Sequence, residues 1–359
     1  MADILDIDTI QQRTKQPPTQ TPPRRYIRSL GQAAQHLVEQ IQNAEGRFMF
    51  GIRPVDIMVR GLGPGELCMF TGKSHSAKTQ VLLNAVANNP ESRVLWVTPD
   101  EVAELVLLKL FAMVEHVNPE DLEEKIKDGD QQMIDTLMTF ANERFPNFQV
   151  VDDTVDQYQL EIAISESTDH WGEPPQLVVF DYLELMPTTD GESTGVVSNA
   201  RAMKALAKEH EIPIVVVHQA SRSGGKRGQA AGIDGMRYGG EAESNFVIEC
   251  FRKVDDESAD EYTRNQQRSV VTVNVAKNKN PPSHKGMVDL FLHPNFGYVR
   301  EIRDGDVGTP QEFTRPSFTR DTAARESQSQ MISRLRAERA ATETPSVVPY
   351  EAGRDDDSF

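Results

Sequence analysis

The sequence has little of three features that would have placed it in a special class of protein. Its two cysteines, Cys68 and Cys250, each lie in an apolar run, which predicts buried reduced thiols and excludes a disulfide framework or a zinc site. No apolar run approaches the roughly 20 residues that span a bilayer. The N-terminus lacks the basic start and apolar stretch of a secretory signal. These absences predict a cytoplasmic protein with no membrane partner.

Positive charge is also scarce, because 38 lysines and arginines stand against 55 aspartates and glutamates, for a formal net charge of −17. This balance argues against a protein that coats nucleic acid with a basic surface. It does not exclude DNA binding through a few basic loops that line a channel, because the field that matters there is local. Any DNA affinity is expected to be modest and strongly dependent on salt.

Composition divides the chain into a main domain and two polar ends. Residues 1–27 carry the stretch KQPPTQTPPRR and are predicted to form a disordered arm. Residues 46–303 form the main domain. Residues 304–359 form a polar tail that ends in EAGRDDDSF, and we predict that this tail is disordered.

A linker helix is predicted at residues 28–45, just before the main domain. Its apolar residues share one helical face, and they are Leu30, Ala34, Leu37 and Ile41. An amphipathic pattern shows that a helix is half-buried but not what covers it. The helix therefore packs either on its own domain or on a neighbouring subunit, and both interpretations stay open.

Apolar runs of strand length recur along the main domain, with helical periodicity between several of them. The predicted strands span residues 66–71, 93–98, 148–151, 176–180, 212–217, 245–251 and 269–275. The predicted helices span residues 79–87, 102–114, 130–144 and 199–210. This alternation indicates an α/β fold with a mostly parallel sheet that is covered on both faces. The last runs, at 269–275, 287–292 and 297–302, have no helices between them and predict antiparallel strands at one edge.

A phosphate-binding loop is predicted by the segment TGKSHSAKTQ at residues 71–80, which follows an apolar strand and opens a helix. It reads G-x-x-x-x-A-K-T, one residue from the P-loop pattern, and would surround phosphates with backbone N–H groups. Lys78 would reach the β- and γ-phosphates of ATP, and the Thr79 hydroxyl would hold Mg²⁺. Ala77 replaces the usual glycine, and an alanine fits there if the local φ is negative and the close approach of the backbone tolerates a methyl group. The loop comprises Gly72, Lys73, Ser74, His75, Ser76, Ala77, Lys78 and Thr79.

Two carboxylates at predicted strand ends complete a candidate hydrolytic site. Asp181 ends QLVVFD, and a carboxylate beside the P-loop strand is where Mg²⁺ needs its water-mediated anchor. Asp100 comes at the end of RVLWVTPDE, where it could orient or deprotonate the attacking water. Asp100 and Glu101 also fit a negative cap for a helix that starts at Val102, and the two interpretations are compatible.

Several segments, in the same order, resemble the motor domain of DnaB-type replicative helicases, which is a RecA-like P-loop NTPase. GIRPVDIMVRGLGPGEL resembles the segment that leads into the nucleotide site of RecA, KaiC and DnaB-type ATPases. VVFDYLELM is similar to the family's Walker B segment, WVTPDEVAEL to the strand end with its catalytic carboxylate, and IPIVVVHQASRS to its γ-phosphate-sensing strand. The resemblance covers residues 28–303 and implies catalytic roles for Asp100 and Gln219, with ATP and Mg²⁺ as cofactors.

The resemblance also implies a homo-oligomer, a hexameric ring whose active sites are shared between subunits. VNVAKNKNPPSHKG is similar to the segment whose basic pair reaches into the neighbouring site, and here the pair is Lys277 and Lys279. A lysine stands where the family has its arginine finger, so weaker transition-state stabilisation is expected. The family's N-terminal primase-binding domain is not recognised, as in bacteriophage-encoded relatives. A replication loader or a primase is an implied partner.

Single-stranded DNA is the implied substrate, because loops after the Walker B and sensor strands line the central channel of RecA-fold motors. Here these loops are residues 187–197 and 221–240. The second loop is rich in glycine and carries four basic residues, which are Arg222, Lys226, Arg227 and Arg237. A flexible solvated loop is the alternative interpretation.

Three functions fit these patterns. The first is an ATP-driven helicase or translocase on single-stranded DNA in replication. The second is a RecA/RadA-like recombination or annealing ATPase, and the third is a DNA-processing accessory factor or nuclease with a degenerate motor. The stretch DYLELM and the linker helix favour the first function over the second. The third would need a cluster of metal-binding carboxylates beyond Asp181, and no convincing cluster is found in the sequence.

Overall fold

The structure is a computed structural model that describes residues 29–42, 46–188, 192–220, 228–230, 239–304 and 306. The predicted arm at residues 1–27 lies outside the described residues, and so does nearly all of the predicted tail. The four-segment division of the chain therefore stays a prediction.

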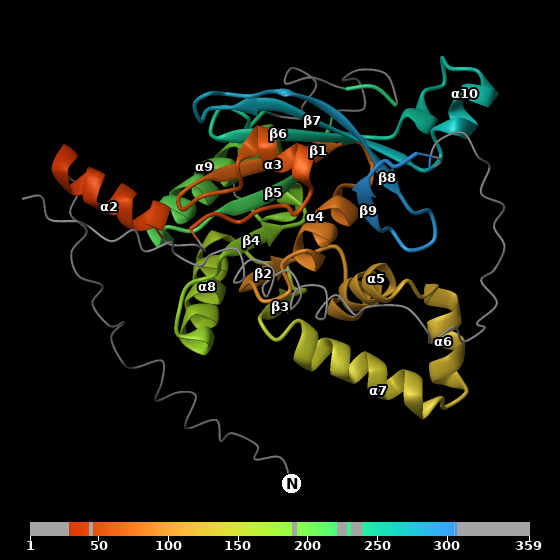
Figure 1. Cartoon of the computed structure of the whole chain (residues 1–359). Coiled ribbons are helices and arrows are strands. Elements are labelled where there is room, and N and C mark those ends of the chain that lie inside the picture. Colours follow the sequence, from red (N-terminus) through yellow and green to blue (C-terminus); the bar gives the residue numbers. More distant parts are fainter. Residues whose placement is uncertain are drawn as a thin grey trace, which may run out of the picture. The chain divides into compact units, whose positions relative to one another are not determined.

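The centre of the molecule is a nine-stranded sheet in the order β3-β2-β4-β5-β1-β6-β7-β8-β9 (Figure 1). From β3 to β6 in this order the strands run parallel, and β7, β8 and β9 continue the sheet in antiparallel fashion. The strands are β1 (Leu67–Gly72), β2 (Val94–Val97), β3 (Phe148–Val151), β4 (Leu177–Phe180), β5 (Ile214–Gln219), β6 (Phe246–Phe251), β7 (Val270–Asn278), β8 (Gly286–Leu292) and β9 (Val299–Glu301). The predicted α/β fold with antiparallel strands at one edge is confirmed.

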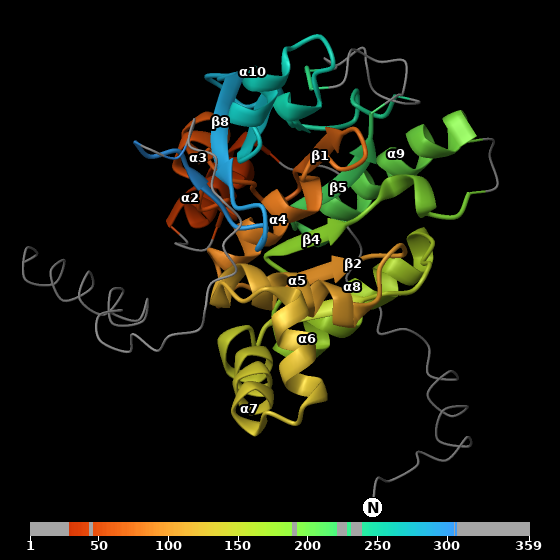
Figure 2. The same cartoon turned by 90° about the vertical axis from the view of Figure 1, so that its right-hand side faces the viewer.

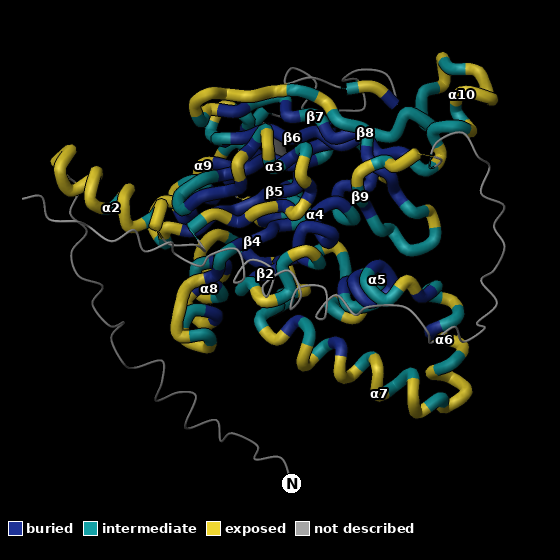
Figure 3. Tube along the Cα trace, in the orientation of Figure 1, coloured by how far each residue is buried: buried dark blue, intermediate teal, exposed yellow. Residues whose placement is uncertain are grey.

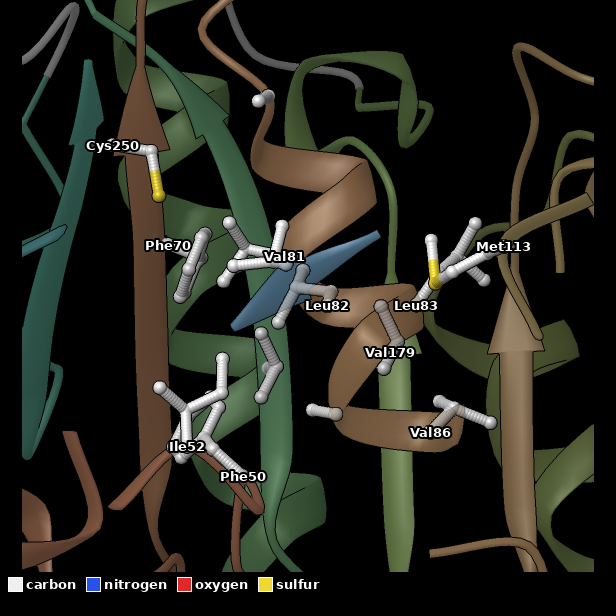
Figure 4. Packing of buried hydrophobic residues seen from close by; sticks show 14 of the residues in the cluster. Phe50, Ile52, Phe70, Val81, Leu82, Leu83, Val86, Met113, Val179 and Cys250 are labelled. Carbon is white, nitrogen blue, oxygen red and sulfur yellow. The ribbon is translucent and has the colours of Figure 1, made fainter. Parts of the chain in front are cut away.

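Helices cover both faces of the parallel part of the sheet (Figures 1 and 2). α4 (Lys78–Ala87) and α5 (Ala103–Glu115) pack on one face, and α8 (Gln157–Trp171) and α9 (Glu192–His210) pack on the other. Alternate side chains of β1 point to opposite faces of the sheet, and helices cover both faces. The strand is therefore buried along its whole length. Figure 4 shows Phe70 of β1 packed near Val81 and Leu82 of α4. This packing fixes the P-loop, which joins β1 to α4.

Four of the described helices were not predicted: α3 (Arg53–Val59), α6 (Pro119–Lys127), α8 and α10 (Glu261–Gln266). The short ones offer too few residues for a clear helical period, since α3, α6 and α10 have 7, 9 and 6 residues. α8 begins with a capping box between Asp156 and Gln159, a start signal that the sequence does carry. Side-chain caps also begin α6 and α10, so capping residues mark these helices better than amphipathic periodicity does.

Two predicted boundaries are corrected by the structure. The helix predicted at 130–144 is an α-helix, α7 (Gln131–Thr139), that continues as a π-helical turn (Phe140–Arg144). The loop predicted at 187–197 is wrong for its second half, because α9 already begins at Glu192. Val196 of this segment is 4% exposed and packs in the same core as Ala200, one helical turn further on.

The predicted linker helix is α2 (Leu30–Gln42), and none of its residues is buried (Figure 3). Leu30 and Ile41 are 90% and 72% exposed, and Leu37 and Val38 are also exposed. The described part of the chain therefore does not cover the apolar face of α2, which favours the interpretation that the helix docks on another subunit. None of the described helices combines the length and the apolar character needed to cross a bilayer.

Candidate nucleotide site

The predicted P-loop, the two carboxylates and Gln219 meet at one cavity of about 360 Å³. It lies where β1, β2, β4 and β5 end, since the carboxyl ends of parallel strands share one edge of a sheet. Its lining includes Ser74, His75, Ser76, Ala77, Lys78, Thr79, Asp100, Asp181 and Gln219. The remaining predicted loop residues, Gly72 and Lys73, line a smaller adjoining pocket.

Lys78 is held inside the loop by backbone carbonyls. The side chain is buried, and its Nζ donates hydrogen bonds to the oxygens of Gly72 and Lys73 at 3.0 and 2.9 Å. Burial lowers the pKa of the Lys78 ammonium, and the Asp181 carboxylate acts in the opposite direction. The loop geometry also depends on Gly72, because a Cβ there would lie 2.3 Å from the carbonyl oxygen of Cys250. These contacts place a cation at the point where the loop turns.

The loop also offers an unused polar group to a ligand. The Ser76 hydroxyl oxygen is buried and has no hydrogen-bond partner in the described part of the chain. A buried hydroxyl without a partner is costly, so it fits a site where an anion supplies the missing acceptor. α4 begins at Lys78, and a helix N-terminus favours negative charge. The residues present therefore fit nucleotide phosphates.

The condition of a negative φ at Ala77 is not met. Ala77 lies in the left-handed region, with φ 67° and ψ 24°, immediately before α4. His75 shares this conformation with φ 63°. A left-handed backbone costs a residue with a Cβ roughly 1–2 kcal/mol relative to glycine. The glycine of the usual P-loop pattern is thus explained by backbone conformation, and the alanine is accepted at an energetic cost.

Thr79 and Asp181 form the oxygen-rich corner of the cavity. The Thr79 hydroxyl donates a hydrogen bond of 2.8 Å to Asp181 Oδ2. Burial raises the pKa of Asp181 to about 6, while the Thr79 hydroxyl and the Lys78 ammonium pull it down. Hydroxyl and carboxylate oxygens are the ligands that Mg²⁺ prefers, so the pair fits this ion. The predicted adjacency of the two strands is wrong, because β5 lies between β1 and β4.

Asp100 and Glu101 have different surroundings. Glu101 forms an ion pair with Lys109 of α5. Asp100 is exposed at the cavity and makes no hydrogen bond or ion pair within the described residues. Neither carboxylate caps α5 by a hydrogen bond, because the N–H of Ala103 at the start of α5 donates to Asp152 Oδ2 at 3.0 Å, and a purely electrostatic contribution to the helix N-terminus stays a prediction. Asp100 is therefore the carboxylate that is available to a water molecule in the cavity.

Gln219 ends β5, and its side chain lines the cavity. Its backbone N–H donates to Glu184 Oε1 at 2.8 Å. Glu184 sits in a short 3-10 helix (Leu183–Leu185) that follows Asp181. The sequence did not single out Glu184, or the further lining residues Gln80, Thr98, Lys109 and Tyr182. Thr98 and Tyr182 could have been suggested only by their positions at strand ends, close to Asp100 and Asp181 in the sequence.

Comparison with known proteins decides the family. A family model described as the DnaB-like helicase C-terminal domain matches residues 48–298. The chain belongs to this family. Among curated proteins, it is 25% identical over 277 residues to the replicative DNA helicase DnaB of Pasteurella multocida, covering 71% of this chain and 56% of that protein. It is 24% identical over 288 residues to the replicative DNA helicase DnaC of Bacillus subtilis, with 76% and 62% covered.

Solved structures give the same fold. One of them, an ATPase domain solved by itself, superposes with a TM-score of 0.65 at 17% identity, covering 77% of this chain and 99% of that one. A DnaB-like replicative helicase, solved to show its interactions with primase, superposes with a TM-score of 0.63, covering 77% of this chain and 68% of that one. The present chain spans a little over half the length of the curated relatives that it matches.

Lys277 and Lys279 are not brought to the cavity of their own subunit. Lys277 lies near the end of β7 and donates to the carbonyl oxygen of Glu241. Lys279 donates to the carbonyl oxygen of Ala242 at 2.9 Å. Burial lowers the pKa of Lys277, and the neighbouring Lys279 lowers it further. The two ammonium groups thus share one turn of the chain, away from the P-loop of the same molecule.

The four basic residues predicted to bind DNA, Arg222, Lys226, Arg227 and Arg237, lie outside the described residues. Residues 228–230 and 239–304 are described, and they border this segment. The DNA-binding assignment therefore stays a prediction.

Proposed function

We propose that this protein is an ATP-dependent helicase or translocase that moves along single-stranded DNA during replication. The observation that carries the proposal is the cavity where the P-loop, Asp181, Asp100 and Gln219 meet, in a chain of the DnaB-like family. ATP would lie with its β- and γ-phosphates against Lys78 and the N-terminus of α4. Mg²⁺, held by Thr79 and Asp181, would supply positive charge to the phosphate oxygens when bound.

Within this arrangement each residue has a distinct role. Asp100 accepts a proton from the attacking water or orients it, because it is the carboxylate at the cavity with neither a hydrogen bond nor an ion pair among the described residues. Lys78 compensates the negative charge that spreads over the transferring phosphoryl group. Gln219 contacts the γ-phosphate through its side-chain amide and responds to its loss. Asp181 and Thr79 are held together by the hydrogen bond from the Thr79 hydroxyl to Asp181 Oδ2.

We also propose a ring in which each site is completed by the next subunit. Lys277 and Lys279 lie apart from their own cavity, so they are available to a neighbour's phosphates. A lysine supplies a point charge without the bidentate fork of an arginine, which predicts slow turnover. The uncovered apolar face of α2 supplies a surface for docking on that neighbour. A hexamer and a primase or loader partner follow from the family alone.

The test is strand displacement on a forked duplex, with ATP hydrolysis measured in parallel and particles imaged with ATP and an oligonucleotide. Closed rings with displacement that depends on ATP are expected. Open filaments without displacement would favour the RecA/RadA-like alternative. ATP turnover that single-stranded DNA does not affect, with neither ring nor filament, would favour an accessory factor.

A further inference from the structure

A half-buried glutamate and a buried histidine lie in contact directly behind Gln219. Glu184 Oε1 lies 2.8 Å from His218 Nδ1, and the two side chains are 13% and 0% exposed. The same Oε1 accepts the backbone N–H of Gln219 at 2.8 Å. Glu184 Oε1 therefore contacts two neighbouring residues of β5. One is His218, which ends the buried part of the strand, and the other is Gln219, which lines the cavity.

The Glu184 carboxylate comes from the segment that follows β4, on the Asp181 side of the cavity. Glu184 belongs to the 3-10 helix that starts three residues after β4, next to the magnesium-side Asp181. Leu183 and Met186 on either side of it are buried, at 0% and 2% exposure, and Asn199 of α9 donates to the carbonyl oxygen of Met186 at 3.0 Å. The short helix is thus firmly seated, and Glu184 reaches from it to the end of β5.

Stability alone does not explain this pair. Glu184 Oε2 and His218 Nε2 are buried without a hydrogen-bond partner in the described part of the chain, and His218 Nδ1 meets Glu184 only as a close charge contact. A buried polar pair that leaves atoms unsatisfied costs more than well-packed apolar residues of the same volume. The place of the pair, next to the Gln219 backbone at the edge of the cavity, therefore points to a role in the site.

We propose that Glu184 is a positioning residue for Gln219. Its carboxylate fixes the backbone of Gln219 relative to Asp181, and His218 contacts that carboxylate from the protein interior. The side chain of Gln219 is thereby oriented toward the γ-phosphate position, at a fixed place relative to the residues that would hold Mg²⁺. Small displacements of a contacting group cost large factors in rate, so a fixed backbone matters at this position.

This inference rests on the proposed ATPase function and is tested beside it. Steady-state ATP hydrolysis and the affinities for ADP and for a non-hydrolysable ATP analogue are measured for the wild type, Glu184→Ala and Glu184→Gln. Glu161→Ala is the matched control, because Glu161 Oε1 also faces a histidine, His210 Nε2, at 3.9 Å, but lies between α8 and α9 outside the cavity.

Glu184→Ala is expected to lower kcat at least about tenfold, which corresponds to about 1.4 kcal/mol of transition-state stabilisation. It should weaken binding of the ATP analogue while ADP affinity stays unchanged, because the phosphate that Gln219 contacts is absent from ADP. Glu184→Gln keeps an acceptor for the Gln219 N–H and should retain kcat within about threefold of the wild type. Glu161→Ala should behave as the wild type.

Wild-type kcat and wild-type discrimination between the ATP analogue and ADP in Glu184→Ala would overturn the inference. So would an equal loss in Glu184→Gln and Glu184→Ala, because the acceptor would then be irrelevant. If Glu184→Ala does not fold, Glu184→Met keeps the volume without the acceptor and replaces it. A wild-type protein that binds nucleotide but does not hydrolyse ATP would instead reject the proposed function, and the analogue-against-ADP comparison would still decide the role of Glu184.

Discussion

Ala77 carries a side chain at a backbone position that favours glycine, with φ 67°. Ala77→Gly is expected to raise the free energy of unfolding by about 1 kcal/mol, because it removes the Cβ from a left-handed residue. ATP turnover should stay at the wild-type rate or rise. The control Ala85→Gly makes the same change in the fully buried interior of α4 and should lower stability by about 1 kcal/mol or more. Denaturant unfolding and ATPase assays give the answer, and a large loss of activity in Ala77→Gly would contradict the loop geometry.

Lys78 donates hydrogen bonds to the carbonyl oxygens of Gly72 and Lys73 at the start of the predicted P-loop. Lys78→Ala is expected to abolish ATP hydrolysis while the fold stays intact, because its charge serves the phosphates. Lys253→Ala removes a lysine that donates to Asp289 Oδ2 at 2.6 Å and does not line the cavity, and it should leave hydrolysis unchanged. Turnover and circular dichroism are compared for both variants. Unchanged turnover in Lys78→Ala would remove the P-loop assignment.

At the scale of the element, α2 is the helix whose apolar residues lack cover within the described part of the chain. Leu37 and Ile41 are 55% and 72% exposed, so replacing both with serine should leave the melting temperature of the domain nearly unchanged. The same double change should shift the protein toward smaller assemblies, because an apolar contact between subunits would be lost. Gln35→Ser, on the exposed polar part of α2, is the control. Light scattering measures the assembly, and an unchanged mass distribution would reject α2 as a docking helix.

Strand β7 contains Lys277 near its end, and Lys279 follows the strand directly. If these lysines act on a neighbour, Lys279→Ala should bind nucleotide and hydrolyse it poorly. Mixing it with Lys78→Ala and allowing subunits to exchange should restore measurable ATPase activity, because some interfaces join an intact P-loop to an intact Lys279. A ring whose sites must hydrolyse ATP one after another would stay inactive in this mixture. Titrating each variant into the wild type separates the cases, because a sequential ring loses activity steeply while independent sites lose it in proportion.

At the scale of the whole molecule, the net charge of −17 makes DNA binding depend on local basic segments. Neutralising Lys226 and Arg227 together should weaken binding to all DNA sequences and reduce the salt dependence by up to about two phosphate contacts. ATP binding without DNA should barely change. Binding is measured by fluorescence anisotropy over a series of salt concentrations. Unaltered affinity and slope would exclude residues 221–240 as the DNA-contacting loop.

The sequence predicts the strands, the order of the motifs and the phosphate-binding loop, because each of these depends on residues that lie close together along the chain. Apolar runs of strand length identified all nine strands of the described sheet to within a few residues. Residues 74–79, Asp100, Asp181 and Gln219 line one cavity, since strand ends of a parallel sheet converge, and their catalytic and ligand-binding roles stay predictions. The sequence itself therefore determined the fold class and which strand ends carry residues that line this cavity.

Only the tertiary structure decided how those residues act on one another. The insertion of β5 between β1 and β4, the left-handed backbone of Ala77 and the capping of α5 by Asp152 all depend on packing between distant segments. The contact of Glu184 with His218 and Gln219 joins residues 34 and 35 positions apart, and no local pattern marks a buried glutamate of this kind. Periodicity reports which face of an element is buried, whereas the partner that it meets is set by the three-dimensional arrangement of the whole sheet.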